Sequence, residues 1–301
     1  VLIGAGSTFI SGSDIKEFSL PLMDPQMPAV IAALEASPKP IIAAIHGAAL
    51  GGGYELALGC DARVAAPDAI LGLPEVTLGM IPGAGGTVRL PRIADPAVAL
   101  DLIVSGRRIA AKEAVEVGLV DRLADGDLRD AAAALAAELA ATTGKRRIRD
   151  LPIKRVDAAA YGNVVEAATR GGKSRPQVLA AIAAVDRALV LPFDEALAAE
   201  RSVFQELRQG EEAAALRHLF FAERVAGKVK AGSASAIPAK VAVIGAGLMG
   251  AGIASSFLGA GFEVHLLDTS EEAVDRGRKS IAAIEDKGVA SGRITASERN
   301  S

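Results

Sequence analysis

Cysteine is almost absent from this sequence, since Cys60 is the only one in 301 residues. An intramolecular disulfide is therefore excluded, and the composition fits a reducing compartment. Cys60 is small and apolar and lies at the expected end of a helix, so we interpret it as a buried, inert thiol and not as a nucleophile. We also expect no metal site.

The sequence has neither an excess of charge of one sign nor long apolar runs. The 33 lysines and arginines nearly balance 36 acidic residues, which leaves a net charge of -3 and no broad basic field for nucleic acid. The densest basic stretch, residues 145–155, is interpreted as a solvated connector, with steering of a polyanionic ligand as the alternative. No apolar run reaches the roughly 20 residues of a membrane span, and no signal peptide is visible.

Glycine is plentiful and is concentrated in residues 45–61, which read IHGAALGGGYELALGCD. Glycines 51–53 let the backbone approach a ligand closely, and they precede a short apolar helix expected at residues 54–59. The unpaired N–H groups at such a helix start suit a short-lived anion. Glu55 places a carboxylate in the first turn of the same helix.

A second glycine-rich turn, residues 83–86, follows Glu75 in the stretch LPEVTLGMIPGAGGTVRLPR. Taken singly, Glu55 has an ordinary interpretation as a helix-capping carboxylate, and Glu75 as a surface-loop carboxylate. Their joint placement beside glycine turns and apolar sequence favours one pocket with two catalytic carboxylates and an anion hole. His46 invites a general-base role, but we interpret it as a hydrogen-bonded structural residue.

The C-terminal part carries a nucleotide-binding pattern. Gly245, Gly247 and Gly250 form GxGxxG directly after the apolar strand VAVI, and Asp268 closes the next expected strand. We expect the glycine turn to hold a pyrophosphate and Asp268 to bind the ribose hydroxyls, which favours NAD over NADP. The alternative is a glycine-rich turn in an unrelated α/β unit.

Between these motifs, strands alternate with helices, which indicates an α/β fold with largely parallel strands. A small, polar linker is expected at residues 231–239. In the preceding helical stretch, Leu197, Phe204, Leu207, Leu216, Leu219 and Phe220 form the expected apolar stripe. The expected strands are residues 40–45, 61–65 and 69–73, and the expected helices are residues 24–37, 87–93, 96–105, 111–117, 127–143 and 177–230, the last with a break at Leu191-Pro192.

Three ordered segments resemble the crotonase (enoyl-CoA hydratase/isomerase) superfamily. They are FISGSDI from Phe9, HGAALGGGYELALGCD from His46 and PEVTLGMIPGAGGT from Pro74. The stretch KVAVIGAGLMGAGIASSFLGAGFEVHLLD, which begins at Lys240, is similar to the opening of the 3-hydroxyacyl-CoA dehydrogenase NAD domain. This order of domains is found in multifunctional enzymes of fatty-acid β-oxidation.

The resemblance implies a crotonase-like ββα spiral, a helical connector and the beginning of a Rossmann-type NAD-binding domain. We place these at residues 1–190, 191–238 and 239–301, and we expect the first to lack its N-terminal part and the last to be truncated. The chain is thus expected to be a piece of a longer parent protein.

The resemblance also implies roles for individual residues. The backbone N–H groups of Ser13 and Gly52 would bind the thioester oxygen, while Glu55 and Glu75 would share one water for hydration of 2-trans-enoyl-CoA to L-3-hydroxyacyl-CoA. The family usually has alanine where Ser13 stands, a mild departure because the main chain contributes. The alternatives are a Δ3-Δ2-enoyl-CoA isomerase using the same pocket, and a non-catalytic crotonase-like binding protein.

The expected partners follow from the same resemblance. They are acyl-CoA thioesters as substrates, NAD as a cofactor of the parent protein, and a thiolase subunit or a second copy of the chain. Since the only histidine after Gly245 is His265, too early for the family's catalytic His-Glu pair, we expect no hydride transfer by this chain alone. The expected location is the bacterial cytoplasm, or the peroxisome if the source is eukaryotic.

Overall fold

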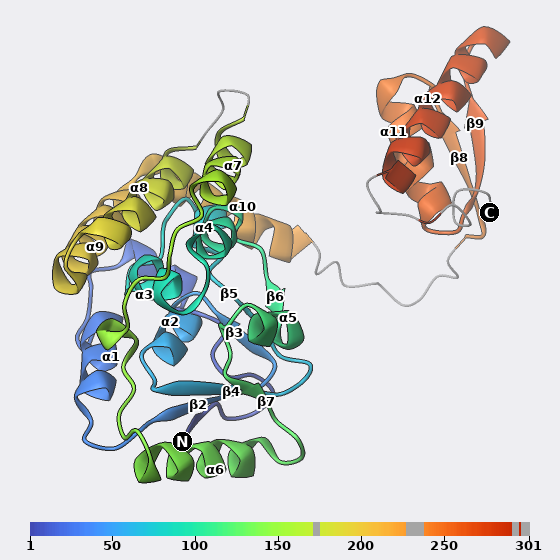
Figure 1. The fold of residues 1–301 in the computed structure, drawn as a ribbon. Helices are drawn as coiled ribbons and strands as arrows, with labels where there is room; N and C mark the ends of the chain where they lie inside the picture. Colours follow the sequence, from blue (N-terminus) through green and yellow to red (C-terminus); the bar gives the residue numbers. More distant parts are fainter. Residues whose placement is uncertain (171–174, 227–237, 291–294, 296–301) are drawn as a thin grey trace. The chain divides into compact units, whose positions relative to one another are not determined.

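The computed structural model describes residues 1–170, 175–226, 238–290 and 295. The chain divides into two compact units, Val1–Lys228 and Val229–Ser301 (Figure 1). Most of the linker expected at residues 231–239 lies outside the described residues.

The strands of the first unit form two sheets. The first is wholly parallel, in the order β1 (Leu2–Ile3), β2 (Ile42–Ile45), β4 (Ala62–Ala65), β7 (Arg122–Leu123). The second has the order β3 (Ala48–Leu50), β5 (Ile70–Gly72), β6 (Ile109–Ala110), with β6 antiparallel to β5. The strands β2 and β4 of the first sheet are each followed along the chain by a strand of the second sheet, β3 and β5 respectively. The prediction of an α/β fold built as a ββα spiral is confirmed.

Helices follow the strand pairs and then continue to the end of the first unit. The helix expected at residues 96–105 has those bounds, and the expected break at Leu191-Pro192 is present. A second break at Gly210 and the helix at residues 158–169 were not predicted. The helices are α1 (Met27–Ala36), α2 (Gly52–Leu58), α3 (Gly86–Ile93), α4 (Pro96–Ser105), α5 (Ala111–Glu116), α6 (Leu128–Ala141), α7 (Ala158–Thr169), α8 (Pro176–Val190), α9 (Phe193–Gln209) and α10 (Glu211–Ala226), with 3-10 turns η1 (Ile15–Ser19), η2 (Glu75–Leu78) and η3 (Ile148–Asp150).

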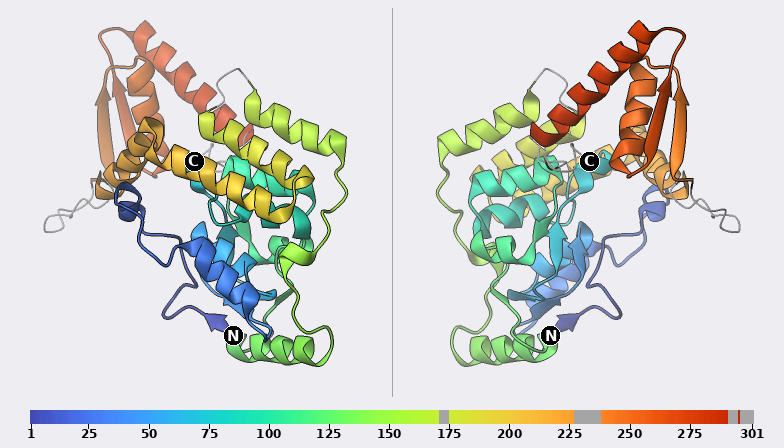
Figure 2. Two further views of the ribbon diagram at one scale, coloured as in Figure 1. Left: turned by 90° about the vertical axis from the view of Figure 1, so that its left-hand side faces the viewer. Right: turned by 90° about the vertical axis from the view of Figure 1, so that its right-hand side faces the viewer.

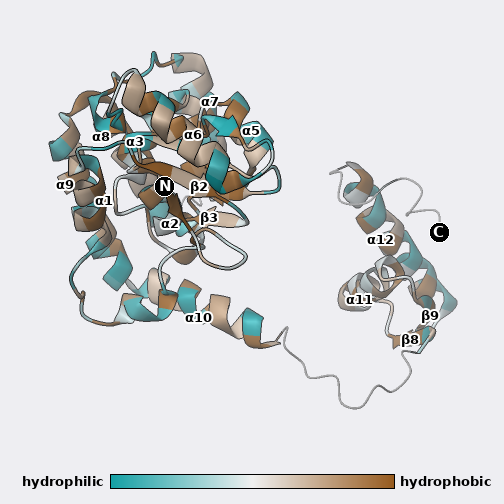
Figure 3. Ribbon diagram, turned by 90° about the horizontal axis from the view of Figure 1, so that it is seen from below, coloured by the Kyte–Doolittle hydropathy of each residue, from teal (hydrophilic) through white to brown (hydrophobic). Residues whose placement is uncertain are grey.

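Strand β2 shows why a continuous apolar run forms a strand here. All four of its residues are buried, because the two faces of the sheet are both covered. Ile42 and Ala44 pack with Leu135 of α6, whereas Ala43 and Ile45 belong to the main core. Helix α6 lies along one face of the sheet, and α8 and α9 lie side by side at the opposite end of the unit (Figures 1 and 2). Hydrophobic colouring is prominent on β2 in Figure 3.

The basic stretch at residues 145–155 is not a solvated connector at its first two residues. Lys145 pairs with the buried Asp61 at 2.9 Å, and Arg146 pairs with Asp121. Asp121 also accepts from Arg63, whose side chain is 2% exposed. Buried carboxylates need such partners to offset the loss of hydration. The sequence interpretation is therefore wrong for Lys145 and Arg146.

The helices after Pro192 pack onto the first unit. Helix α9 buries four residues at a spacing of four, namely Ala196, Glu200, Phe204 and Arg208. Helix α10 buries only Ala213, and Leu219 of the expected apolar stripe is 53% exposed. Residues 193–226 therefore belong to the first compact unit, while the domain boundaries at 190 and 238 remain proposals.

The second unit begins with a strand–helix–strand segment. β8 (Lys240–Ile244) pairs in parallel with β9 (Glu263–Leu267), and α11 (Leu248–Gly259) connects them. α12 (Glu271–Ala290) packs against α11. In neither unit does a described helix have the length and apolar character needed to cross a membrane.

Candidate active site

Ser13 and Gly52 lie next to each other. A Cβ built on Gly52 would stand 3.0 Å from Ser13 Oγ. The loop before Ser13 is fixed beside β3, because Ile10 donates to the Ala48 carbonyl and accepts from the Leu50 N–H, both at 3.1 Å. Gly52 begins α2, so its N–H has no acceptor within the helix. Among the described residues, neither this N–H nor that of Ser13 has a protein acceptor, which leaves both able to bind an oxyanion.

The glycines around this pair are required by their surroundings. Gly51 adopts φ +54°, and its N–H donates to the Gly72 carbonyl. A Cβ on Gly53 would stand 2.1 Å from the Ile10 carbonyl oxygen, so no side chain fits there. The Gly-Gly-Gly sequence therefore allows the close approach of two backbone segments that brings Ser13 to Gly52.

Glu55 points from α2 to the second glycine turn. Its Oε1 accepts hydrogen bonds from the N–H groups of Ala84 at 2.7 Å and Gly86 at 2.9 Å. The side chain is buried, and burial raises the pKa of Glu55 above its usual value, although these two N–H groups and the nearby Arg89 oppose the rise. Glu55 is thus held in place by the turn that follows Glu75 in the sequence.

Glu75 is the first residue of the turn η2 and faces the first glycine turn. A Cβ on Gly51 would lie 3.2 Å from its Oε1. Its Oε2 is buried and has no hydrogen-bond partner among the described residues. Burial raises the pKa of Glu75 well above its usual value, and the negative charge of Glu55 raises it further.

The four residues Ser13, Gly52, Glu55 and Glu75 are therefore brought together in the first unit. The negative charge of Glu55 contributes to the raised pKa of Glu75, which indicates that the two carboxyl groups are close. Carboxyl groups with raised pKa values can both give and take protons near neutral pH. Two free N–H groups beside them can stabilise negative charge on an oxygen.

A third buried carboxylate, Glu200, was missed by the sequence analysis. It comes from α9, and it accepts from the N–H groups of Gly85 at 2.6 Å and Thr87 at 2.8 Å and from the Thr87 hydroxyl at 2.5 Å. Burial and the charge of Glu55 raise the pKa of Glu200 to about 8. Its spacing of four from the buried Ala196 and Phe204 was a usable signal, because it places Glu200 on the inward face of α9.

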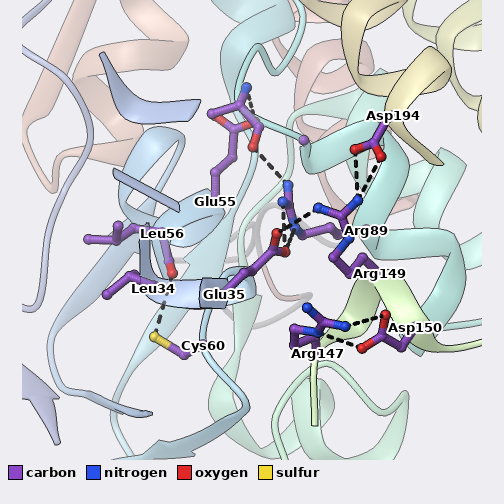
Figure 4. A network of polar contacts seen from close by, with 12 residues as sticks. Leu34, Glu35, Glu55, Leu56, Cys60, Arg89, Arg147, Arg149, Asp150 and Asp194 are labelled. Atoms are coloured by element: carbon purple, nitrogen blue, oxygen red, sulfur yellow. Dashed lines mark hydrogen bonds and ion pairs between the residues drawn. The ribbon is translucent and has the colours of Figure 1, made fainter. Parts of the chain in front are cut away.

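An ion-pair network, buried at Arg89 and Glu35, supports the same turn from another side. Arg89 donates to the Ala84 carbonyl at 2.9 Å and to Glu35 through Nη2 at 2.9 Å. Figure 4 shows Arg89 and Arg149 both directed at Glu35, and Arg149 in contact with Asp194 of α9. The N–H of Ala84 therefore donates to Glu55, and its carbonyl oxygen accepts from Arg89.

His46 and Cys60 occupy structural positions. His46 Nε2 lies 3.1 Å from the Gly6 carbonyl oxygen, as expected of a hydrogen-bonded structural histidine. Cys60 is buried, and burial raises the pKa of its thiol to about 12, so at neutral pH it is protonated and unreactive.

In the second unit the glycine turn has room for a ligand. A Cβ on Gly245 or Gly247 would meet nothing within 4 Å, and Gly245 has φ +105°. A Cβ on Gly250 would stand 1.7 Å from the Gly245 carbonyl oxygen, so glycine permits the close contact of α11 with the turn. Asp268 lies at the same place, and its Oδ2 accepts from the Ala246 N–H at 2.6 Å. Such an open turn at a helix N-terminus fits a dinucleotide pyrophosphate.

His265 lies on β9 and is 58% exposed. Its Nε2 is 3.0 Å from Glu263 Oε1, an oxygen that also contacts Lys240 on β8. These exposed side chains supply no buried acid–base pair.

Comparison with known proteins assigns the family. Residues 1–170 match the enoyl-CoA hydratase/isomerase model, and residues 240–301 match the model of the 3-hydroxyacyl-CoA dehydrogenase NAD binding domain. The chain belongs to the enoyl-CoA hydratase/isomerase family and continues into a dehydrogenase NAD-binding domain.

Relatives with both parts are similar along nearly the whole chain. The peroxisomal bifunctional enzyme of Danio rerio is 37% identical over 292 residues, which cover 93% of this chain and 40% of that protein. The fatty acid oxidation complex subunit alpha of Idiomarina loihiensis is 36% identical over 314 residues, which cover 98% of this chain and 44% of that protein. This chain therefore spans about two fifths of the length of these relatives. A solved enoyl-CoA hydratase from Bacillus anthracis is 31% identical, with a TM-score of 0.42 and coverage of 73% of this chain and 76% of that one.

Proposed function

We propose that the first unit hydrates 2-trans-enoyl-CoA thioesters to L-3-hydroxyacyl-CoA as a step of fatty-acid β-oxidation. The observation that carries the proposal is the meeting of Glu55 and Glu75, both buried, beside the free N–H groups of Ser13 and Gly52. The family match and the names of the relatives point to the same reaction class.

The proposed mechanism assigns a role to each of these groups. The thioester oxygen accepts hydrogen bonds from the N–H groups of Ser13 and Gly52. These N–H groups stabilise the enolate as negative charge develops on that oxygen. Glu55 and Glu75 hold one water; a carboxylate takes its proton while the water oxygen bonds to the β carbon. A proton from the carboxyl pair then goes to the α carbon on the same face, which completes a syn addition and restores the thioester.

A direct assay tests this proposal. The natural full-length protein should hydrate crotonyl-CoA, and the absorbance of the conjugated thioester should fall while 3-hydroxybutyryl-CoA appears. A folded protein that leaves this absorbance unchanged would contradict the hydratase assignment.

A second candidate activity is Δ3-Δ2-enoyl-CoA isomerisation in the same pocket. The buried Oε2 of Glu75 has no partner among the described residues, so this oxygen is available to move a proton between two carbons of an acyl chain. Isomerisation requires one such proton shuttle and no bound water. Conversion of a 3-enoyl-CoA to the conjugated 2-enoyl-CoA by the full-length protein would support it.

For the whole protein we propose an additional NAD-dependent oxidation of the 3-hydroxyacyl-CoA product. Gly245 and Gly247 would hold the pyrophosphate and Asp268 the adenosine ribose of NAD, which would supply the hydride acceptor for this oxidation. The match of residues 240–301 to the NAD binding domain supports this assignment. Reduction of NAD by the full-length protein with L-3-hydroxybutyryl-CoA is the corresponding assay.

Partners and location are proposed from the relatives. One relative is named as the alpha subunit of a fatty acid oxidation complex and another as a peroxisomal enzyme. We propose a thiolase subunit or a second copy of this chain as the partner, in the bacterial cytoplasm or, for a eukaryotic source, the peroxisome. A single monomeric species in native mass measurements of co-expressed proteins would contradict both partners.

A further inference from the structure

The turn that holds Glu55 is shared between two carboxylates. Four consecutive backbone N–H groups donate hydrogen bonds to the two carboxylates in turn. Ala84 and Gly86 donate to Glu55, and Gly85 and Thr87 donate to Glu200. All four distances lie between 2.6 and 2.9 Å. Because the N–H groups belong to one short backbone segment, movement of the segment away from Glu200 also moves the donors that fix Glu55.

Helix α9 is seated closely enough to fix the segment. A Cβ on Gly83 would stand 2.3 Å from the ring of Phe204, one helical turn after Glu200. A Cβ on Gly85, whose φ is +106°, would stand 1.7 Å from Arg89 Nη1. The turn is thus in close contact with α9 on one side and with Arg89 on another, and only glycine fits at positions 83 and 85.

We infer that Glu200 is a positioning residue of the hydratase site, which clamps the Ala84–Thr87 turn and thereby sets the place of Glu55. The inference rests on the proposed function of Glu55 and Glu75. It assigns α9 to the catalytic apparatus, although Glu200 lies 113 to 115 residues from the groups it contacts.

The geometry requires a carboxyl group at this position. One oxygen accepts from Gly85, and the other accepts from the Thr87 N–H while it also contacts the Thr87 hydroxyl. A glutamine can accept a hydrogen bond with its side-chain oxygen, but its NH2 group would face the remaining backbone N–H and cannot accept a hydrogen bond from it. Glu200→Gln therefore leaves one buried N–H unpaired without changing the volume of the side chain.

Glu200 also contributes charge. Its negative form raises the pKa of Glu75, after the larger effects of burial and Glu55. The other charged groups that act here are Arg89 of α3 and Arg201, which is next to Glu200 on α9 and donates to the Gly83 carbonyl. Because the pKa of Glu200 is about 8, its negative charge acts mainly above that pH, and Glu200→Gln should therefore remove a change of rate near pH 8 from the pH–rate profile.

The test compares Glu200→Gln with Glu206→Gln in the natural full-length protein. Glu206 lies on the same helix but is exposed, so this control makes the same chemical change away from the turn. We expect Glu200→Gln to lower kcat for crotonyl-CoA by about 10- to 100-fold, because small misplacements of catalytic groups cost rates of this size, with KM changed less than about threefold. Glu206→Gln should match the unchanged protein.

Amide hydrogen exchange gives a readout that does not depend on activity. Peptides spanning residues 82–90 should exchange faster in Glu200→Gln and not in Glu206→Gln. If the unchanged protein fails to hydrate crotonyl-CoA, the hydratase proposal falls, yet faster exchange in this segment would still support the clamp. Unchanged kcat, unchanged pH profile and unchanged exchange in Glu200→Gln would overturn the inference.

A second variant keeps the test decisive if Glu200→Gln does not fold. Thr87→Val removes only the hydroxyl contact and leaves both backbone contacts. We expect a smaller fall in kcat, about threefold for one weakened hydrogen bond, and faster exchange in the same segment. Wild-type kcat and exchange in Thr87→Val would then overturn the inference.

Discussion

Glu55, Glu75 and Glu200 are all buried carboxyl groups of the first unit, and they differ in the donors that each accepts. Glu200 accepts three donors, and Glu55 accepts two through one oxygen. Oε2 of Glu75 has none among the described residues. A carboxyl oxygen without donors can gain or lose a proton without breaking contacts. Glu75 is therefore the best suited of the three to carry protons to and from substrate carbons.

The first prediction separates the two catalytic carboxyl groups. Glu75→Gln should lower both hydration and double-bond isomerisation by about 100- to 10,000-fold, because both reactions need this proton carrier. Glu55→Gln should lower hydration by a similar factor but leave isomerisation measurable, since only hydration needs the second carboxyl group to hold water. Rates with crotonyl-CoA and with a 3-enoyl-CoA are the measurement.

The exposed Glu195 provides a control on α9, and Glu195→Gln should leave both rates unchanged. Equal losses of the two activities in Glu55→Gln and Glu75→Gln would remove the assigned roles.

A second prediction concerns pH and stability. The pKa of Glu200 is raised from 4.5 to about 8 on folding, so the folded state holds a proton that the unfolded state has lost in this range. The free energy of unfolding should therefore fall as pH rises from 4.5 to about 8, at up to about 1.4 kcal/mol per pH unit from this group. Glu200→Gln should make this slope less negative in denaturant titrations at several pH values. A slope identical to that of the unchanged protein would refute the assignment.

At the scale of the element, the helices α8, α9 and α10 brace both turns of the site. Gln177 of α8 donates to the Val76 carbonyl at 3.2 Å, and Gly79, which ends the turn η2, packs against Ala213 of α10. Glu200 of α9 holds the other turn. The orientation of Glu75 therefore depends on two helices that follow it by about a hundred residues or more, as the 101-residue separation of Gln177 from Val76 illustrates.

A prediction at this scale uses two glycines with similar positive φ angles. Gly79 has φ +78°, and a Cβ there would stand 2.7 Å from Ala213 Cα, whereas Gly126 has φ +86° and open space around it. Gly126→Ala should lower the free energy of unfolding by only about 1 kcal/mol, because alanine disfavours the left-handed conformation. Gly79→Ala should lower the free energy of unfolding by roughly 1 to 3 kcal/mol more, because α10 must move. It should also lower hydratase turnover.

Denaturant unfolding and crotonyl-CoA turnover of the two variants are the measurements. Equal stability and equal turnover in Gly79→Ala and Gly126→Ala would show that α10 does not fix the Glu75 turn.

Local sequence predicted the elements far better than their contacts. The run PIIAAI and its turn signals predicted β2, and the three glycines at 51–53 predicted the start of α2 together with Glu55. Glu200 could not be assigned in this way, since helical spacing identifies an inward face but not the surface that it meets. The pairing of Lys145 with Asp61 was missed for the same reason, because neither local segment contains both partners.

At the scale of the whole molecule, the two groups of predicted site residues belong to different compact units. Ser13, Gly52, Glu55 and Glu75 lie in the unit Val1–Lys228, and the glycine turn with Asp268 lies in the unit Val229–Ser301. Each group is held by contacts within its own unit. The two proposed activities should therefore respond separately to mutation.

The last prediction tests this separation. Asp268 accepts hydrogen bonds from the N–H groups of Ala246 and Thr269, which lower its carboxyl pKa and keep it ionised beside the glycine turn. As an ionised acceptor it should bind the adenosine ribose hydroxyls and repel a 2′-phosphate, so the full-length protein should bind NADH more tightly than NADPH. Asp268→Ala should weaken NADH binding by about tenfold or more, the loss expected for a charged hydrogen bond, and leave crotonyl-CoA hydration unchanged.

Titration of NADH fluorescence and the hydration assay, carried out on the same preparation, measure both effects. The control is Asp275→Ala on α12, where the carboxylate is exposed and its nearest ion-pair contact, with Arg278, is 3.9 Å long. This variant should keep both NADH binding and hydration. If Asp268→Ala binds NADH normally, Asp268 is not the ribose ligand; if it loses hydration as well, the sites are coupled and the two units do not act independently.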